Sequence, residues 1–550
     1  MLFNKVNRSQ TLLFVPSCID DYAPAGSKPR FIVETINNMD LSKLYEKYSR
    51  QGAEALDPAA LLATWILAYS ERVTSSRVLE AKCRRDFHYI YTSGDLQPNY
   101  STLCRFRIRH ADFLPEVMVE ILIRAKERGL TDFKDIYTDG TKIQASCSSK
   151  QSKDAKGLQS LLDDVRREID EYMALCDAAD DVEFENEKAR EAQKQHDKNL
   201  AREAHLLQCQ EALEARKREL KPEHRDNHKI NLVEPEARTM SGAAGKQCLP
   251  AYNAQVSVEG KNDFIVAEEV VTEPNDQQQL SRQVENVNQS IGEDPARKNT
   301  LDAGYHTKDE LQKAEEKKLD LVVADPAPEN RSTKSTPTSV DEILKQDRKV
   351  QRADFVFHKE DDFYQCPAGE KLEFRRAYKN GGATGRVYKK STSCTPCPLF
   401  RLCVGGKSKS SFKQIHRDDR EHYAEKMYEK LQTEEAKERL KNRRCTVEPA
   451  IGCLKQNMGF RRFRLRGLEK VKIEFLLMCL AYNFNKLFRL MQGSGAPRAA
   501  ANANESPKEA RKTVEILFCV FILVAFITYI YMSYQKYKKS TAIQNTENAH

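Results

Sequence analysis

The sequence predicts a mixed α/β protein that begins with a helical region. Apolar residues recur at helical spacing through residues 1–130, and short apolar runs typical of strands begin at Lys134. Four strand-like runs, a helical stretch and a further strand-like run then follow, which is the pattern of a mixed sheet with helices. With 550 residues, of which 40% are hydrophobic and 31% charged, the chain is long enough for two to four folded domains.

The N-terminal region, residues 1–130, is expected to contain helices with recognisable starts. A polar residue that can cap a helix precedes each predicted start, and at the first start a proline occupies the first turn, where it is tolerated. The predicted starts are Asp57-Pro58, Ser75 or Ser76, and Ser101 or Thr102.

The third of these helices is basic. It carries Arg105 and Arg107, which are candidate DNA contacts. Short helices with a basic final helix are typical of a helix-turn-helix DNA-binding domain. A helical bundle with a solvated basic face fits the same pattern equally well.

The strand-like runs place two aspartates in or next to a sheet. Residues 134–145 form the first run and contain Asp139, and residues 251–273 are expected to form a hairpin that turns at 260–262. A later run ends at Asp302, and residues 307–318 predict the helix that follows it.

Two long segments interrupt this predicted sheet. Residues 151–222 are rich in charged residues and carry leucines at helical spacing, which predicts an inserted helical hairpin whose charges form a solvated face. Residues 326–440 form a second insertion that contains a group of cysteines. We therefore expect a DNA-binding domain at 1–130 and an α/β domain at 131–492 that contains both insertions.

The C-terminal residues differ in composition from the rest. Residues 493–510 have the composition of a linker, and residues 511–550 form a hydrophobic tail. Within it, residues 516–535 carry no charge and are flanked by Lys and Arg, which meets the criterion for one membrane-spanning helix and hence a single-pass membrane anchor. A buried terminal helix and a tail without a selected role remain alternatives.

Three carboxylates far apart in sequence are candidates for one catalytic site. Asp139 and Asp302 lie at strand-like runs, and Glu448 is expected at a helix start because Pro449 suits the first helical position. Clustered carboxylates raise one another's pKa unless a cation intervenes, and Mg²⁺ or Mn²⁺ prefers such ligands. Two such ions about 4 Å apart can promote in-line phosphodiester displacement.

The stretch around Glu448 has the charge expected of a phosphate-binding surface. Residues 441–467 hold eight Lys and Arg side chains and one carboxylate, Glu448. Spacing predicts that Glu448, Gly452, Lys455 and Gly459 share one helical face. Apolar residues that could anchor the segment then alternate with candidate DNA-binding arginines. The apolar residues are Phe460, Phe463 and Leu465, and the arginines are Arg461, Arg462, Arg464 and Arg466.

The spacing within this stretch resembles the signature of insertion-sequence transposases of the DDE type. That signature reads Tyr, two residues, Arg, three residues, Glu, six residues, Lys, and it is matched by Arg444, Glu448 and Lys455, with Lys441 in place of the Tyr. "YTDGTKIQA" and "LDAGY" are similar to the strands that carry the family's two aspartates, and residues 56–107 are similar to its N-terminal helical domain.

The resemblance implies an RNase H-like catalytic core and the activity of a transposase. Such an enzyme binds terminal inverted repeats and target DNA, cleaves DNA and transfers strands, and acts as a dimer or larger assembly. It would be cytoplasmic and nucleoid-associated. Asp139, Asp302 and Glu448 would bind Mg²⁺ or Mn²⁺, and Arg444 and Lys455 would contact phosphate. The alternative is a catalytically inactive DNA-binding derivative, with or without the membrane anchor.

Four of the fifteen cysteines form a spaced group. The spacing C-x27-C-x2-C-x5-C contains one compact pair typical of a structural Zn²⁺ site, and the four residues are Cys366, Cys394, Cys397 and Cys403. A reduced cluster without metal remains the alternative. Because the N-terminal residues lack the pattern of a signal peptide, we expect a reducing compartment and scattered free thiols elsewhere.

Overall fold

A computed structural model describes most of the chain up to residue 493. The described residues are 18–48, 55–178, 187–220, 228–241, 248–332, 335–380, 383–405 and 410–493. None of the helices within these ranges contains an apolar stretch sufficient to span a bilayer. The predicted membrane span at 516–535 lies outside them.

The N-terminal region is helical, as predicted. Its helices are α1 (Lys28–Asn37), α2 (Ser42–Tyr45), α3 (Pro58–Ser70), α4 (Ser76–Arg85), α5 (Phe87–Ser93), α6 (Tyr100–Arg109) and α7 (Leu114–Glu127). The Asp57 carboxylate accepts a hydrogen bond from the Ala59 N–H at 3.0 Å, which confirms the predicted start of α3. Helix α6 begins earlier than predicted, because Asn99 is the residue whose side chain caps it.

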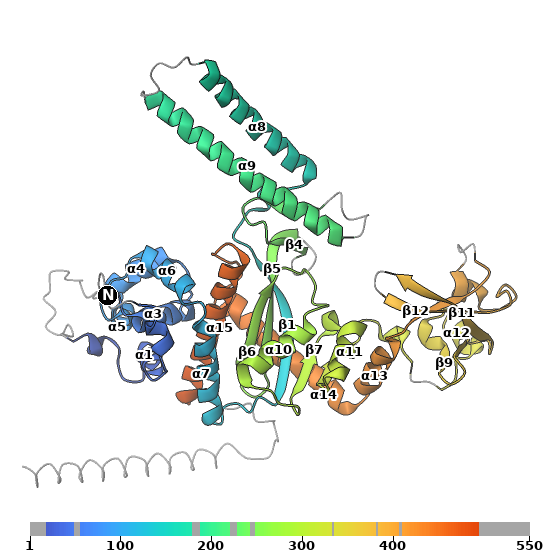
Figure 1. The fold of residues 1–550 in the computed structure, drawn as a ribbon. Helices are drawn as coiled ribbons and strands as arrows, with labels where there is room; N and C mark the ends of the chain where they lie inside the picture. The colour runs from blue at the N-terminus through green and yellow to red at the C-terminus, as the bar shows by residue number, and fades with distance from the viewer. Residues whose placement is uncertain are drawn as a thin grey trace, which may run out of the picture. The chain divides into compact units, whose positions relative to one another are not determined.

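A mixed six-stranded sheet follows this helical region (Figure 1). The strands are β1 (Asp135–Gln144), β4 (Arg238–Ser241), β5 (Cys248–Glu259), β6 (Ile265–Val271), β7 (Lys298–Leu301) and β8 (Asp320–Val323). Their order is β4-β5-β1-β7-β8, and β6 also pairs with β5. Strands β1, β7 and β8 are parallel, whereas β5 is antiparallel to β1 and β6. This is the mixed sheet of an RNase H-like domain, as expected.

Helices from the second half of the chain pack around the sheet. They are α10 (Leu280–Ile291), α11 (Lys308–Glu316), α13 (Glu421–Leu431), α14 (Glu434–Gly452) and α15 (Leu468–Met491). Helix α14 contacts β1, β5, β7 and β8, whereas α15 contacts β6 together with α3 and α7. One hydrophobic core therefore runs from the N-terminal helices through the sheet to α15.

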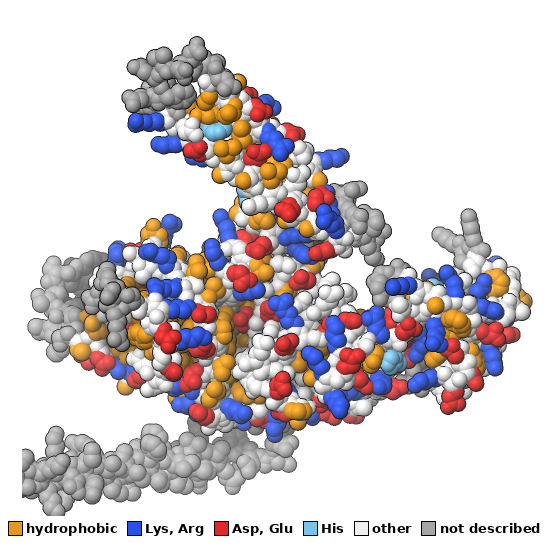
Figure 2. All heavy atoms as spheres, in the orientation of Figure 1, with side chains coloured by type: hydrophobic (Ala, Val, Ile, Leu, Met, Phe, Trp, Pro, Cys, Tyr) orange, Lys and Arg blue, Asp and Glu red, His pale blue; other side chains and the backbone are white. Residues whose placement is uncertain are grey.

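The first insertion is a helical hairpin, as predicted. It consists of α8 (Ala155–Ala178) and α9 (Glu187–Glu219), and β2 (Ser152–Lys153) pairs with β3 (Ile230–Asn231) next to it. The hairpin has a small core of its own, in which Leu158 and Leu213 are fully buried. It also exposes apolar side chains, and hydrophobic atoms are visible along its surface in Figure 2.

The second insertion contains a sheet that the sequence did not predict. Helix α12 (Val340–Lys345) precedes β9 (Val356–His358), β10 (Phe363–Gln365), β11 (Lys371–Asn380), β12 (Ala383–Lys389) and β13 (Gln414–Asp418), which form an antiparallel sheet in the order β13-β12-β11-β10-β9. The predicted boundary at residue 440 lies inside α14. Helix α13 packs against α11 and β8 of the main domain, so this second sheet ends before α13 begins.

Candidate active site

The parallel pairing of β1 and β7 brings two of the predicted acids together. Thr138 pairs with Leu301, so Asp139 and Asp302 are the next residues on their neighbouring strands. Asp302 directly follows β7 and caps the short turn Ala303–Tyr305, in which its Oδ1 accepts a hydrogen bond from the Gly304 N–H at 2.8 Å. Sheet register therefore places two carboxylates that are far apart in sequence next to each other on neighbouring strands.

Asp139 lies in an environment that disfavours its charge. Burial, together with the negative charge of Asp302, raises the pKa of the Asp139 carboxyl to about 6, although Arg443 opposes this shift. Asp139 Oδ1 accepts a hydrogen bond from the Gly140 N–H at 2.8 Å. A partly buried carboxyl with a perturbed pKa next to a second carboxyl is typical of a functional site.

Helix α14 brings Glu448 toward these aspartates, with Arg443 in between. Nη1 of Arg443 lies 3.1 Å from Asp139 Oδ2, and its Nη2 lies 3.9 Å from Glu448 Oε1. The Arg443 side chain is 9% exposed, whereas that of Glu448 is 56% exposed. One guanidinium therefore links the carboxylate of the strand to the carboxylate of the helix.

The local setting of Glu448 differs from the prediction. Glu448 and Pro449 lie in the interior of α14, not at a helix start. A proline inside a helix costs about 3 kcal/mol or more. Packing against the sheet offsets this cost, because Arg439, Arg443 and Val447 of the same helix are buried.

The carboxylates fit a divalent ion by their chemistry but do not converge on one point. Asp and Glu oxygens are the ligands that Mg²⁺ and Mn²⁺ prefer. Among the residues that the structure describes, no three Cys, His, Asp or Glu side chains are arranged to hold a metal ion. The positive charge between Asp139 and Glu448 belongs to Arg443.

The predicted helical face beyond Glu448 is interrupted. Helix α14 ends at Gly452, residues Cys453–Asn457 form a π-helical turn, and Gly459 has a φ of 70° outside any helix. Lys455 nevertheless reaches the site, because its Nζ donates to the Lys142 carbonyl of β1 at 2.9 Å. Burial lowers the pKa of the Lys455 ammonium, and the charge of Lys142 lowers it further.

The basic segment after Lys455 is anchored by aromatic side chains, as predicted. Phe460 and Phe463 are buried, and Phe463 lies edge-on to Tyr252 of β5. The neighbouring arginines Arg461, Arg462, Arg464 and Arg466 are all exposed. Two of them are held by backbone carbonyls at the end of β1, because Arg462 donates to Ala145 and Cys147 and Arg466 donates to Ser146.

Other predicted DNA contacts differ in their exposure. Arg444 and Arg105 are exposed. Arg107 is 4% exposed, donates to the Tyr69 hydroxyl at 2.8 Å and lies 4.0 Å from the centroid of the Trp65 ring. Arg107 is therefore a core residue of the N-terminal region, and its assignment as a DNA contact is corrected.

Basic and acidic side chains are mixed over the surface. Figure 2 shows Lys and Arg interspersed with Asp and Glu on the face that it draws. Charge alone therefore does not outline a path for DNA on this face.

The four cysteines of the second insertion line one cavity of about 200 Å³. Burial, together with the neighbouring Cys394, Cys366 and Cys397, raises the pKa of the Cys403 thiol to about 11, although Lys413 opposes this shift. Three of them also pack against the apolar core of this second sheet. The cluster meets no geometric criterion for a bound metal, so zinc binding stays a prediction.

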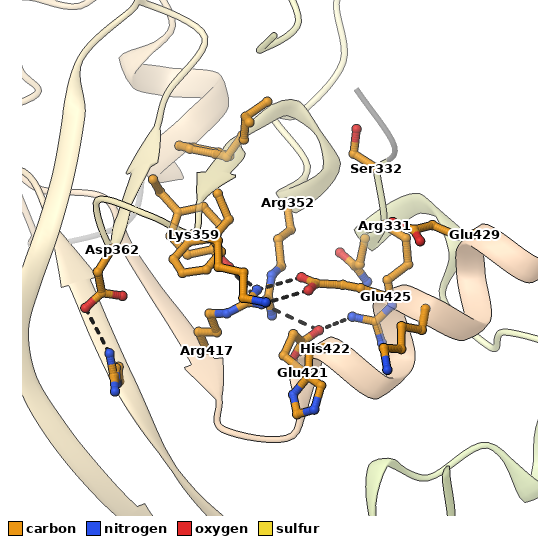
Figure 3. Close-up of a pocket in the computed structure, with 17 residues that line it drawn as sticks. Arg331, Ser332, Arg352, Lys359, Asp362, Arg417, Glu421, His422, Glu425 and Glu429 are labelled. Atoms are coloured by element: carbon orange, nitrogen blue, oxygen red, sulfur yellow. Dashed lines mark hydrogen bonds and ion pairs between the residues drawn. The ribbon is translucent and has the colours of Figure 1, made fainter. Parts of the chain in front are cut away.

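A larger cavity of about 670 Å³ lies where the second sheet meets α13 (Figure 3). Its arginines are engaged by carboxylates: Arg417 forms a bidentate pair with Glu425 at 2.6 and 2.7 Å, and Arg331 pairs with Glu421. Glu421 is 1% exposed and also pairs with Lys308 of α11 at 2.6 Å. This charged network joins the second sheet to the main domain.

Sequence reasoning missed two residues at the candidate active site. The resemblance points to Arg444, because it fixes a spacing and does not show which arginine faces the sheet, whereas in the structure Arg443 lies on Asp139. Asp276 lies in a loop and its carboxylate reaches Lys142 of β1 at 3.7 Å. Gly140 and Gly304 leave room for another side chain to approach the backbone, and in the structure that side chain is Asp276. These two glycines were therefore the only hint of Asp276 that we can identify in the sequence.

Two regions of the chain match known protein families. Residues 365–488 match a family described as a transposase DDE domain, and this match includes Glu448. Residues 17–109 match a second family, described as a transposase domain, that covers most of the N-terminal helices. No curated protein and no solved structure matches the chain.

Proposed function

We propose that this chain, which matches a transposase DDE domain over residues 365–488 and a second transposase domain over residues 17–109, is an insertion-sequence DDE transposase. In this proposal it binds the terminal inverted repeats of its element and catalyses metal-dependent cleavage and strand transfer of DNA. The observation that carries the proposal is the position of Arg443, whose guanidinium lies between Asp139 and Glu448. A strand and a helix far apart in sequence thus present their acids to one cation.

In this proposal Asp139, Asp302 and Glu448 hold Mg²⁺ or Mn²⁺ after the Arg443 guanidinium has moved aside. A bound divalent ion would activate a water or a 3′-hydroxyl and stabilise the leaving oxygen of the phosphodiester. The basic residues around Glu448 hold and orient the DNA backbone, because Lys and Arg side chains contact phosphates without reading the base sequence.

The assignments of the DNA-binding residues rest on exposure and location. Lys455 is fixed beside β1, and Arg444, Arg461, Arg462, Arg464 and Arg466 are exposed on the same segment. Arg105 of α6 is exposed in the N-terminal domain, which we propose recognises the terminal repeats. We also propose that the enzyme acts as a homodimer, that residues 131–492 form the catalytic domain, and that four cysteines of the second insertion hold structural zinc.

The test is Mg²⁺-dependent nicking of a duplex taken from the inverted repeats that flank the gene. The substitution Glu448→Gln should lower nicking at least about 100-fold, because a neutral amide is a poor ligand for a divalent ion, and should leave DNA binding unchanged. The matched control is Glu438→Gln, an exposed residue of the same helix, which should nick like the wild type.

A second candidate function is a DNA-binding protein without catalytic activity. It is favoured by the finding that no three described side chains are arranged to hold a metal. Equal nicking by the wild type and Glu448→Gln would contradict the role of Glu448. Specific binding of the repeats with no nicking by the wild type in Mg²⁺ or Mn²⁺ would favour the non-catalytic function.

A further inference from the structure

Asp276, in the loop between β6 and α10, is held firmly from strand β5. Its Oδ1 accepts hydrogen bonds from Asn253 Nδ2 at 2.7 Å and from Gln255 Nε2 at 2.6 Å. Both donors are fully buried. Since the two donors extend from one strand, the carboxylate of Asp276 has a fixed place although its residue lies in a loop.

The carboxylate of Asp276 occupies space beside the backbone of both candidate catalytic aspartates. Gly140 directly follows Asp139, and a Cβ there would lie 2.6 Å from Gln255 Nε2 and closer still to Asp276 Oδ1. A Cβ on Gly304, two residues after Asp302, would lie 3.4 Å from Asp276 Oδ2. Neither glycine has a positive φ, so close approach by side chains, not backbone conformation, explains the glycine at 140.

A tyrosine completes this network on the side of Asp302. The hydroxyl of Tyr305 donates a hydrogen bond to Gln255 Oε1, and Tyr305 is fully buried. Gln255 is thereby bonded both to Asp276 and to the turn that follows Asp302. The network links β5, the loop of Asp276 and the end of β7 into one rigid unit.

We propose that Asp276 is a positioning residue that fixes Asp139 and Asp302 relative to each other for metal binding. It acts through Gln255 and through contact with the backbone at Gly140 and Gly304. Ligands of a catalytic metal must be held within about 0.5 Å of their productive geometry by a supporting layer of residues. This inference rests on the proposed function of the same site.

The experiment compares Asp276→Ala and Asp276→Asn in single-turnover nicking over a series of Mg²⁺ concentrations. Loss of a residue that orients metal ligands typically costs about 10–100-fold in metal affinity or activity. We therefore expect Asp276→Ala to slow nicking by that factor and to raise the Mg²⁺ concentration for half-maximal rate. In Asp276→Asn, the amide oxygen can still accept both hydrogen bonds, so most of the activity should be retained.

Two further variants separate positioning from loss of folding. Tyr305→Phe keeps the ring but removes the hydroxyl that bonds Gln255, and it should also raise the Mg²⁺ requirement. Glu273→Gln, in the same loop, should behave like the wild type. Thermal unfolding and DNA binding of each variant show whether the fold is intact.

Three outcomes would overturn the proposal. If Asp276→Ala nicks like the wild type while Glu448→Gln does not, the positioning role is wrong and the proposed function stands. If Asp276→Asn is as inactive as Asp276→Ala although both are folded, the negative charge itself is needed and Asp276 acts directly. If Tyr305→Phe leaves the Mg²⁺ requirement unchanged, the hydrogen bond from Tyr305 to Gln255 does not help to position the metal ligands, and the proposed route through Gln255 is wrong.

Discussion

At the scale of single residues, the candidate site depends on which side chains face the sheet. Asp139, Asp302 and Glu448 could be named from the sequence because they stand in motifs that resemble those of a known family. Arg443 could not, since adjacent arginines at 443 and 444 differ only in which side of α14 packs against β1. The structure separates them, because Arg443 is buried and Arg444 is exposed.

The position of Arg443 predicts competition between its guanidinium and a divalent ion. In Arg443→Gln, Mn²⁺ should bind more tightly in the absence of DNA, because no cation has to leave the space between Asp139 and Glu448. The metal-free variant should be less stable by about 3 kcal/mol, since Asp139 loses its partner. Calorimetric titration with Mn²⁺ and urea unfolding without metal measure the two effects.

The control for this prediction is Lys441→Gln, an exposed residue two positions earlier on α14. It should change neither Mn²⁺ affinity nor stability. Weaker Mn²⁺ binding by Arg443→Gln than by the wild type would mean that Arg443 supports the metal site and does not compete with the ion.

At the scale of helices and strands, local patterns predicted the elements well where tertiary packing agreed with them. The start of α3, strand β1, the hairpin of β5 and β6 and the pair α8 and α9 were all predictable from caps and periodicity. The interior position of Pro449 was not, because the burial of α14 on the sheet outweighs the local preference of proline for a first turn. The short strands β9 and β10 were missed because their apolar runs are brief and lie among charged residues.

The cysteine-containing sheet carries a prediction of its own. If Cys366, Cys394, Cys397 and Cys403 hold zinc, the purified protein should contain zinc in a stoichiometric amount, and chelation should lower the temperature at which this sheet unfolds. Cys397→Ser should lose the metal, whereas Cys445→Ser, on α14, should retain it. A fully folded protein without zinc would show that packing of reduced thiols is sufficient.

At the scale of the whole molecule, the order of strands in the main sheet determines the site. Parallel pairing of β1 with β7 places Asp139 beside Asp302, and α14 returns to the same sheet after the whole second insertion. The mixed α/β class was predictable from the succession of elements. The pairing itself was not, because strand register depends on contacts between residues more than a hundred positions apart.

The junction between the second sheet and the main domain predicts a dependence of stability on pH. Burial raises the pKa of the Glu421 carboxyl, but Arg352, Lys308 and Arg331 together outweigh it, so the pKa lies below its usual value. A carboxyl with a lowered folded-state pKa stabilises the protein above its unfolded-state pKa of about 4.5. This stabilisation should be lost progressively as the pH falls below that value.

Urea unfolding of the wild type and of Glu421→Gln at pH 7 and at pH 4 measures this contribution. The wild type should lose stability over this interval by more than the variant does, because the variant has no carboxyl to protonate at this position. Equal losses in the two proteins would show that the Glu421 network does not link pH to stability.

The proposal that three acids share one divalent ion is tested most directly by Fe²⁺-dependent cleavage of the polypeptide. With hydrogen peroxide and ascorbate added, Fe²⁺ bound in place of Mg²⁺ reduces the peroxide to hydroxide and hydroxyl radicals, and the radicals cut the chain close to the ion. We expect cuts next to Asp139, Asp302 and Glu448 in the complex with DNA, suppressed by an excess of Mg²⁺ and absent in Asp139→Asn. Cuts confined to other positions, or cuts that persist in Asp139→Asn, would contradict the assignment of these carboxylates as the metal site.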